Sequence, residues 1–212
     1  MRGSQRIVED NYVDIDYIQF SQSTLLRTAT SIAGYISWIV ILPLALLARL
    51  SDFMFLTGSQ VVALIPFIFG TIMRYEFYRL TLKKCGRNVH IGFGTVFTYR
   101  DIEIGDNVLI GMYNTIHHCN FGSYVLIADG CRFLSGSRYH NFLKTDTPIA
   151  LQGGQLKRIR VANDVWIGAD CVVMDSIGKG SVLGAGSVVT KPIEEYAIAV
   201  GNPAKKIKSR KA

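Results

Sequence analysis

Apolar side chains that recur every six residues constrain the fold of this chain more than any other feature of its sequence. An amphipathic helix repeats its apolar residues about every 3.6 positions, and a half-buried strand about every two. A period of six, with a glycine or alanine after the apolar residue, instead describes one flat face of a triangular β-solenoid. Four triplets carry this period: Ile104, Ile110 and Ile116; Phe121, Ile127 and Phe133; Val161, Ile167 and Val173; and Ile177, Leu183 and Val189.

The fifth position of each hexad is expected to face the interior of the prism, so it must hold a small or medium residue. Cys131 and Cys171 fall at this position, and core packing therefore explains them better than reactivity does. The four cysteines of the chain show no spacing typical of a metal site or of a disulfide framework. We expect reduced thiols and no bound metal.

Two uncharged runs precede the solenoid, Thr28 to Ala48 and Phe53 to Met73. Each has 21 residues, and a helix that spans a bilayer needs about 20. The chain is 49% hydrophobic and 18% charged, which is apolar for a soluble protein of this size. Pro43 and Pro66 interrupt the runs. The runs could therefore form two membrane-spanning helices or a re-entrant hairpin that is kinked at the prolines. A third possibility is a helical hairpin buried inside a soluble protein.

Basic residues flank the two runs and place both ends of the hairpin on the cytoplasmic side of a bacterial inner membrane, by the positive-inside rule. The sequence thus predicts a polar segment over residues 1–27, a membrane-associated helical hairpin over 28–80 and a solenoid over 81–208. The flanking residues are Arg27, Arg74, Arg79, Lys83 and Lys84.

The six-residue period is lost between Leu134 and Arg160. Long excursions from a regular scaffold usually carry function. We therefore expect residues 134–160 to form a protruding loop that supplies part of the functional site.

Three later motifs, together with the hexads, make the sequence specific enough to resemble a known family. They are Asp164-Val165-Trp166-Ile167-Gly168-Ala169, the stretch from Gly184 to Lys191, and Ala199-Val200-Gly201-Asn202-Pro203-Ala204-Lys205. Residues 86–208 resemble the hexapeptide-repeat O-acetyltransferases, which include nodulation-factor, maltose, galactoside and exopolysaccharide acetyltransferases. The resemblance implies a left-handed parallel β-helix and a homotrimer with its active sites between neighbouring prisms.

His140 occupies the position of the family's catalytic histidine, because Thr147-Pro148-Ile149 and Gln152-Gly153 follow it. Transfer of an acetyl group from a thioester to a hydroxyl needs a general base, and histidine suits that task near neutral pH. Many relatives carry an acidic residue directly after this histidine, whereas this chain has Asn141. Asp146 or a backbone carbonyl is then expected to orient the imidazole. Tyr139, Asn141 and His117 are expected to contact the acceptor.

The resemblance also implies acetyl-coenzyme A as the acyl donor, with its pantetheine arm along a wall of small residues and its phosphates near lysines. Small residues allow a ligand to approach the backbone closely. The expected coenzyme contacts are Trp166, Gly168, Ala169, Ala185, Gly186, Ser187, Lys191, Pro203, Lys205 and Lys206.

These features and the resemblance together predict an acetyl-coenzyme A-dependent O-acetyltransferase that acts on a sugar hydroxyl of a lipid-linked cell-envelope or exopolysaccharide precursor, in preference to a free sugar. A membrane anchor favours a lipid-linked acceptor, because confinement to one surface raises its effective concentration. A non-catalytic scaffold and an N-acetyltransferase of an amino sugar remain alternatives. A γ-type carbonic anhydrase is disfavoured because the zinc-binding His-x4-His pair is missing. Nucleic-acid binding is disfavoured because membrane flanks and coenzyme phosphates account for the net charge of +7.

Overall fold

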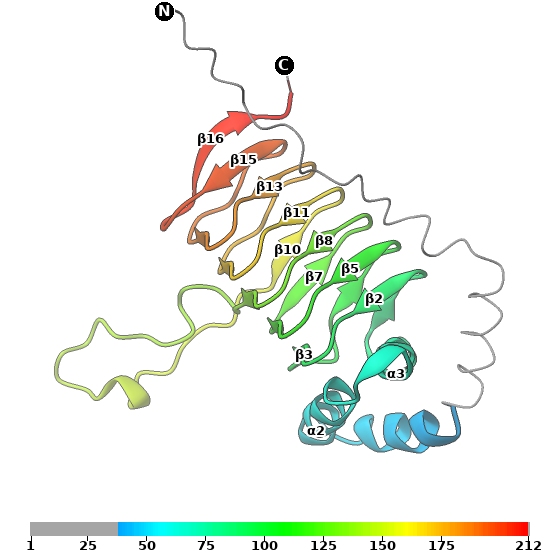
Figure 1. The fold of residues 1–212 in the computed structure, drawn as a ribbon. Helices are drawn as coiled ribbons and strands as arrows, with labels where there is room; N and C mark the ends of the chain where they lie inside the picture. The colour runs from blue at the N-terminus through cyan, green and yellow to red at the C-terminus, as the bar shows by residue number, and fades with distance from the viewer. Residues whose placement is uncertain (1–37, 212) are drawn as a thin grey trace, which may run out of the picture.

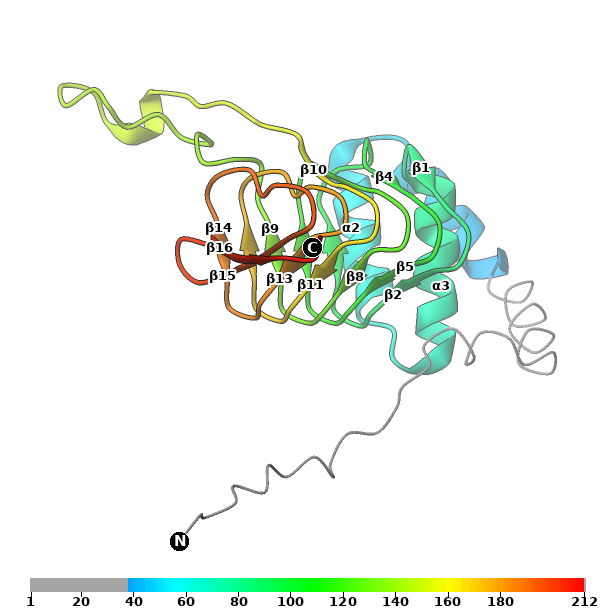
Figure 2. The same cartoon turned by 90° about the horizontal axis from the view of Figure 1, so that it is seen from above.

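The computed structural model describes residues 38–211, and the expected polar segment 1–27 lies outside them. From residue 84 onward the chain winds into a solenoid of short parallel strands with a triangular cross-section (Figure 2). Helices cover its N-terminal end, and the loop around residues 134–158 projects from one edge (Figure 1). The mainly β, parallel solenoid expected from the period of six is confirmed.

Three sheets form the faces of the solenoid. Sheet A contains β1 (Lys84–Cys85), β4 (Glu103–Ile104), β7 (Cys119–Phe121) and β10 (Ile159–Val161). Sheet B contains β2 (Val89–Ile91), β5 (Val108–Ile110), β8 (Leu126–Ile127), β11 (Trp166–Ile167), β13 (Val182–Leu183), β15 (Ala197–Val200) and β16 (Lys205–Ser209). Sheet C contains β3 (Val96–Phe97), β6 (Thr115–Ile116), β9 (Arg132–Phe133), β12 (Val172–Val173) and β14 (Val188–Val189). The last pair, β15 and β16, is antiparallel and ends the solenoid.

The predicted hexads stack in register from coil to coil. Ile127 pairs with Ile110 on one side and with Ile167 on the other, and Phe133 lies between Ile116 and Val173 in the same way. The twelve apolar residues of the four triplets are each at most 4% exposed, so they form the interior column of the prism. Cys131 and Cys171 are free and fully buried, as their hexad position predicted.

Small residues mark the corner after sheet B because the coils approach one another closely there. A Cβ on Gly168 would lie 2.6 Å from the backbone nitrogen of Ala185 in the next coil. Any larger residue would therefore push the coils apart, which explains the small residue that follows the apolar residue in these hexads.

The N-terminal cap consists of a helical segment over residues 38–48, α2 (Asp52–Ala63) and α3 (Phe67–Thr81). Ser51 begins α2, where its hydroxyl accepts a hydrogen bond of 3.2 Å from the Met54 amide. Pro66 separates α2 from α3, because proline has no N–H with which to continue a helix. The uncharged run from Phe53 to Met73 is therefore two short helices rather than one.

The structure therefore does not support the membrane hairpin that was expected over residues 28–80. Within residues 38–211, no helix combines the length and apolarity needed to cross a membrane. Residues 28–37 of the first uncharged run lie outside the described residues.

Aromatic residues of α2 and α3 close the open end of the prism. Tyr78 packs on Phe97 of β3 with ring centroids 4.5 Å apart, and Phe77 stacks on Phe55 at 6.2 Å. The Ser59 hydroxyl lies 2.7 Å from the Tyr78 hydroxyl and accepts a bond of 3.0 Å from the Phe97 amide. The cap is therefore continuous with the solenoid core.

Arg74, expected as a basic flank of a membrane segment, is instead buried between α3 and the first coil. It is 1% exposed and donates to the carbonyl oxygens of Ile91 at 2.8 Å and Ile65 at 2.7 Å. Burial lowers the pKa of its guanidinium. Its role is to satisfy backbone carbonyls at the junction, so it does not contribute to a charged rim.

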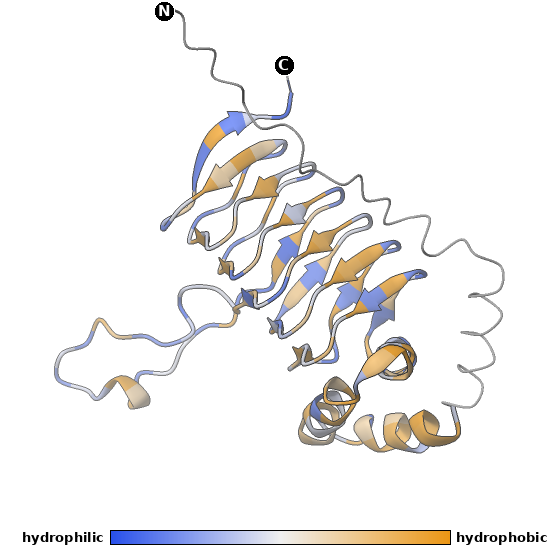
Figure 3. Cartoon of the chain, viewed as in Figure 1, coloured by the Kyte–Doolittle hydropathy of each residue, from blue (hydrophilic) through white to orange (hydrophobic). Residues whose placement is uncertain are grey.

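The helices of the cap are rich in apolar residues (Figure 3), and many of these side chains are exposed. Phe67 is 87% exposed and Phe53 is 72% exposed, values unusual for phenylalanine. We call the exposed apolar residues of the cap the apolar cap face; its members are Ile39, Val40, Leu46, Leu47, Leu50, Phe53, Leu64, Phe67 and Ile68.

Candidate active site

The loop that interrupts the hexads is a two-stranded ribbon. Lys157 donates its backbone N–H to Ser135 O at 2.9 Å, and Asn141 donates to Gly153 O at 2.8 Å. The side chain of Gln152 closes the tip by donating to the carbonyl oxygens of Lys144 and Thr147, at 2.8 and 2.7 Å. A short 3-10 helix, η2 (Ile149–Leu151), precedes Gln152. The predicted protruding loop is therefore present and internally hydrogen-bonded.

His140 lies on this ribbon with its side chain exposed. Its ring meets the Tyr139 ring edge to face, with centroids 4.7 Å apart. Gly154 lies against it on the opposite strand, where a Cβ would come within 1.7 Å of Tyr139 O. Glycine at residue 154 thus lets the two strands approach at the position of the candidate base.

The expected orienting partner of His140 is not found within residues 38–211. Asp146 instead accepts a hydrogen bond of 3.1 Å from its neighbour Thr147. Asn141, expected to contact the acceptor, donates its amide to Gln152 O at 3.1 Å and so helps to shape the loop. Within the described part of the chain, Asp146 and Asn141 therefore do not orient the His140 imidazole.

His117 and His118 lie where the ribbon leaves the solenoid. His117 is half-buried, and its Nδ1 is buried without a hydrogen bond to any described residue. Burial, and then the neighbouring His118, lower the pKa of His117, which favours the neutral ring. The acceptor contact expected of His117 stays a prediction.

The partners of His118, which were not predicted from the sequence, come from two other places in the solenoid: the turn between β3 and β4, and the residue before β10. Asp101 Oδ1 lies 3.3 Å from His118 Nδ1, Arg158 forms an ion pair with the other oxygen of Asp101, and the Tyr99 ring stacks on the imidazole at 3.8 Å. No spacing along the chain signals this cluster, since Asp101 and Arg158 are far apart in sequence.

The expected coenzyme wall is assembled at the corner that follows sheet B. Gly186 donates its N–H to Ala169 O at 2.8 Å, and Gly168 donates to Leu183 O at 2.9 Å, so neighbouring coils place these residues side by side. Trp166 is 55% exposed beside them. Ser187 departs from the expectation, because its side chain is buried and its hydroxyl donates to Gly184 O at 2.6 Å. Its hydroxyl therefore belongs to the core.

The basic residues expected at the coenzyme phosphates lie at the C-terminal end of the solenoid. Lys205 and Lys206 are in β16, where Lys205 pairs with Val200. Lys206 forms an ion pair of 2.7 Å with Glu194, which also lowers the pKa of that carboxyl. Lys191 and Pro203 are exposed.

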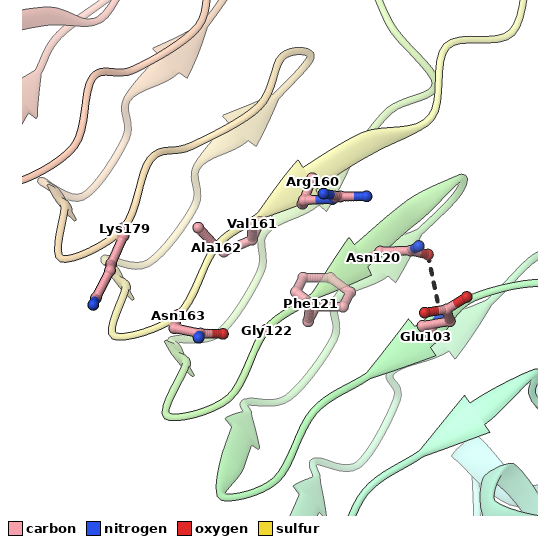
Figure 4. A pocket seen from close by; sticks show the side chains of 9 residues that line it. All are labelled: Glu103, Asn120, Phe121, Gly122, Arg160, Val161, Ala162, Asn163 and Lys179. Carbon is pink, nitrogen blue, oxygen red and sulfur yellow. Dashed lines mark hydrogen bonds between the residues drawn. The ribbon is translucent and has the colours of Figure 1, made fainter.

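The wall and His140 are not brought together within one chain. The ribbon points away from the solenoid in both views (Figures 1 and 2), and within residues 38–211 no hydrogen bond or ion pair links His140 to the wall. A hollow of about 300 Å³ lies elsewhere, on the outer face of sheet A (Figure 4). It is lined by Glu103, Asn120, Phe121, Gly122, Arg160, Val161, Ala162, Asn163 and Lys179.

Comparisons with known proteins identify the family to which these motifs belong. No protein-family model matches the sequence. The chain is 36% identical over 134 residues to a probable acetyltransferase of Mycobacterium tuberculosis, a match that covers 60% of this chain and 44% of that protein. It is 32% identical over 120 residues to a probable macrolide acetyltransferase of Lysinibacillus sphaericus, covering 46% of this chain and 67% of the relative. The chain belongs to the hexapeptide-repeat acetyltransferases.

Solved hexapeptide-repeat acetyltransferases share its fold. A maltose O-acetyltransferase from Clostridium difficile has a TM-score of 0.67 at 21% identity, over 74% of this chain and 86% of that chain. A galactoside acetyltransferase in complex with coenzyme A has a TM-score of 0.64 at 24% identity, over 76% and 80%. Both likenesses concern the fold, and they are consistent with the left-handed coil expected from the sequence. The chain spans about half the length of the first curated relatives it matches, 44% and 57%.

Proposed function

We propose that this hexapeptide-repeat acetyltransferase transfers the acetyl group of acetyl-coenzyme A to a sugar hydroxyl, with His140 as the general base. One observation carries the proposal: the histidine loop and the wall of small residues are both present on the family's scaffold. Matched relatives are acetyltransferases, and one structural neighbour is complexed with coenzyme A. A scaffold protein has no need of either feature.

In this mechanism His140 takes the proton of the acceptor hydroxyl as the oxygen attacks the thioester carbonyl. Backbone amides of the wall are placed to stabilise the oxyanion that develops. Collapse of the tetrahedral intermediate breaks the carbon–sulfur bond, and the imidazolium returns the proton to the coenzyme thiolate. The separation of His140 from the wall within one chain supports a homotrimer in which neighbouring prisms complete each site.

The coenzyme site is tested by Ala185→Trp, since Ala185 is exposed on the wall and a bulky ring there fills the groove. We expect the KM for acetyl-coenzyme A to rise at least about tenfold, equivalent to roughly 1.4 kcal/mol of binding. Coenzyme A release, measured with thiol reagents over a panel of envelope sugars and amino sugars, reports the change. Glu195→Trp, exposed at another corner, serves as the matched control. An unchanged KM in Ala185→Trp would place the coenzyme elsewhere.

We also infer that the enzyme works on the cytoplasmic side of a bacterial inner membrane, on a lipid-linked precursor of an envelope or exopolysaccharide glycan. The apolar cap face supports this placement, because large apolar side chains exposed together at one end of a protein mark a contact with lipid or with another protein. Helices with an exposed apolar side can lie in the bilayer interface without spanning it.

Membrane contact predicts a specific loss of vesicle binding. In Phe53→Asp/Phe67→Asp, two highly exposed phenylalanines become charged, and we expect the partition onto phosphatidylethanolamine–phosphatidylglycerol vesicles to fall at least about tenfold. Ile207→Asp changes an apolar residue that is 65% exposed at the far end of the solenoid, and it should bind vesicles like the wild type. Equal binding by all three proteins in a sedimentation assay would exclude the cap face as the lipid contact.

A further inference from the structure

The hollow on the outer face of sheet A has no part in the proposed acetyl transfer. None of the residues expected to bind the coenzyme or to act on the acceptor lines it. Its volume of about 300 Å³ is at the lower end of the range for small-molecule sites. Figure 4 shows Lys179 and Asn163 at one end of the hollow and Asn120 and Glu103 at the other. The two ends differ in their hydrogen bonding and charge.

A column of side chains runs along the corner that follows sheet A, and it caps backbone N–H groups from coil to coil. The Arg87 N–H donates to Asp106 Oδ1 at 2.7 Å. The Asp106 N–H donates to Ser123 Oγ at 3.0 Å, and the Ser123 N–H donates to Asn163 Oδ1 at 2.9 Å. Each coil thus supplies one side-chain oxygen to the N–H of the coil before it.

This column is interrupted at the hollow. Val161 pairs with Ile177, and the Gly180 N–H donates to Asn163 O at 3.0 Å, so the next residue of the column after Asn163 is Lys179. A lysine side chain has donors and no acceptor. The Asn163 N–H accordingly has no hydrogen-bond acceptor within residues 38–211. The hollow therefore presents a backbone donor that the preceding coils keep paired.

Two cations at the hollow also lack an anionic partner. Arg160 points outward from β10 and Lys179 is exposed at the corner, and neither forms an ion pair with any described residue. Glu103 does not neutralise them, because it pairs with Lys83 at 2.6 Å, a contact that also lowers the pKa of its carboxyl. Glu195 follows Lys179 in the column and makes no ion pair with it either. The Lys179 end of the hollow is therefore positively charged.

A ligand that carries an oxyanion and hydroxyl groups matches this arrangement. One oxygen of the anion can accept the Asn163 N–H, as the side-chain oxygens of the column do in the earlier coils, while its charge meets Lys179. Asn120 Oδ1 accepts from the Glu103 N–H at 3.1 Å, and Asn163 Oδ1 is used in the column. The NH₂ groups of both amides thus remain as donors to hydroxyl oxygens.

We propose that this hollow is a binding site for an acidic sugar, separate from the site of acetyl transfer. Its carboxylate or phosphate binds the Asn163 N–H and the Lys179 ammonium, with Arg160 as the second cation that attracts it. Its hydroxyls accept hydrogen bonds from the Asn120 and Asn163 amides. The inference does not depend on the proposed function, because it concerns binding alone.

Calorimetric titration of the full chain with glucuronate, glucose 6-phosphate and methyl glucoside tests the site. Coenzyme A is present in every titration, so that the acids do not enter the site expected for its phosphates. We expect the acidic sugars to bind at least about tenfold more tightly than methyl glucoside, because only they form charge-assisted hydrogen bonds. Added salt should weaken them. Tight binding of only one of the two acids supports the proposal and identifies the anion as carboxylate or phosphate.

Lys179→Asp is the sharpest variant, because it removes the cation and supplies the oxygen that the column lacks. Its carboxylate can accept the Asn163 N–H, as Asp106 accepts that of Arg87. We expect the affinity for the acidic sugars to fall at least about tenfold, with no fall in the melting temperature. Lys179→Gln replaces this variant if the aspartate disturbs folding. In the wild type, the NMR signal of the Asn163 amide should shift as the acid is added.

Arg160→Gln should weaken the acidic sugars about threefold or more, since it removes the second cation. Arg132→Gln is the matched control, because Arg132 also points outward from a strand, here β9 of sheet C. Its affinities should equal those of the wild type. Equal binding of the acids and methyl glucoside, or wild-type affinity in a folded Lys179 variant, would overturn the inference. Neither result bears on acetyl transfer, which is measured separately by coenzyme A release.

Discussion

His140→Ala is expected to lower kcat by about 10²- to 10⁴-fold, the range over which a positioned general base acts. The side chain is exposed and makes no hydrogen bond within residues 38–211, so its removal leaves no buried group unpaired and should not change the melting temperature. Acetyl-coenzyme A binding, measured by calorimetry, should also be unchanged, because in the proposed mechanism His140 acts on the acceptor hydroxyl and the coenzyme is held by the wall. The loss is then confined to the chemical step.

Leu143→Ala is the appropriate control for that experiment. Leu143 lies in the same loop and is 86% exposed, and its truncation removes a side chain of similar size from the ribbon. If both variants lose activity equally, the loop acts through its shape and not through the His140 imidazole. If neither loses activity, the base lies elsewhere.

The second large effect is on stability, and we expect Phe133→Ala to reduce the free energy of unfolding by about 3–5 kcal/mol. Phe133 is fully buried, lies between Ile116 and Val173 in the interior column, and meets the Phe121 ring edge to face at 5.2 Å. Truncation leaves a cavity that the stacked coils cannot close without losing register. Urea unfolding followed by circular dichroism measures the change.

Arg132→Ala provides the comparison on the same strand. Arg132 is the outward-facing neighbour of Phe133 in β9, and substitutions of this kind usually stay within about 0.5 kcal/mol. Equal destabilisation by the two variants would contradict the assignment of Phe133 to the core and Arg132 to the surface.

The solenoid could be predicted from the sequence because its determinants are local and repeated. Each hexad has an apolar residue that faces the interior and a small residue at the corner. Ile127 could therefore be assigned to the interior and Gly168 to a corner without any knowledge of distant contacts. The loop could be predicted for the complementary reason, since residues between Leu134 and Arg160 lack the period. Ser187 shows the limit, because it was expected to contact the coenzyme and its side chain is instead buried in the core.

The helical cap and the His118 cluster could not be predicted in this way. The run from Phe53 to Met73 is apolar and long enough for a spanning helix. Hydropathy does not show, however, that Phe55 and Phe77 are buried where the cap closes the end of the prism. The cluster depends on the stacking of separate coils, which brings Asp101, His118 and Arg158 together. Such contacts follow from the register of the coils and leave no spacing in the sequence.

Product analysis is the most direct test of our proposal that this chain moves an acetyl group from acetyl-coenzyme A to a hydroxyl. Purified protein, acetyl-coenzyme A and a panel of sugars and lipid-linked sugars are incubated, and mass spectrometry of each acceptor is compared with free coenzyme thiol. We expect at least one acceptor to gain a single acetyl group, in an amount equal to the thiol released. Thiol release without any acetylated acceptor, or neither product despite bound coenzyme, would contradict it.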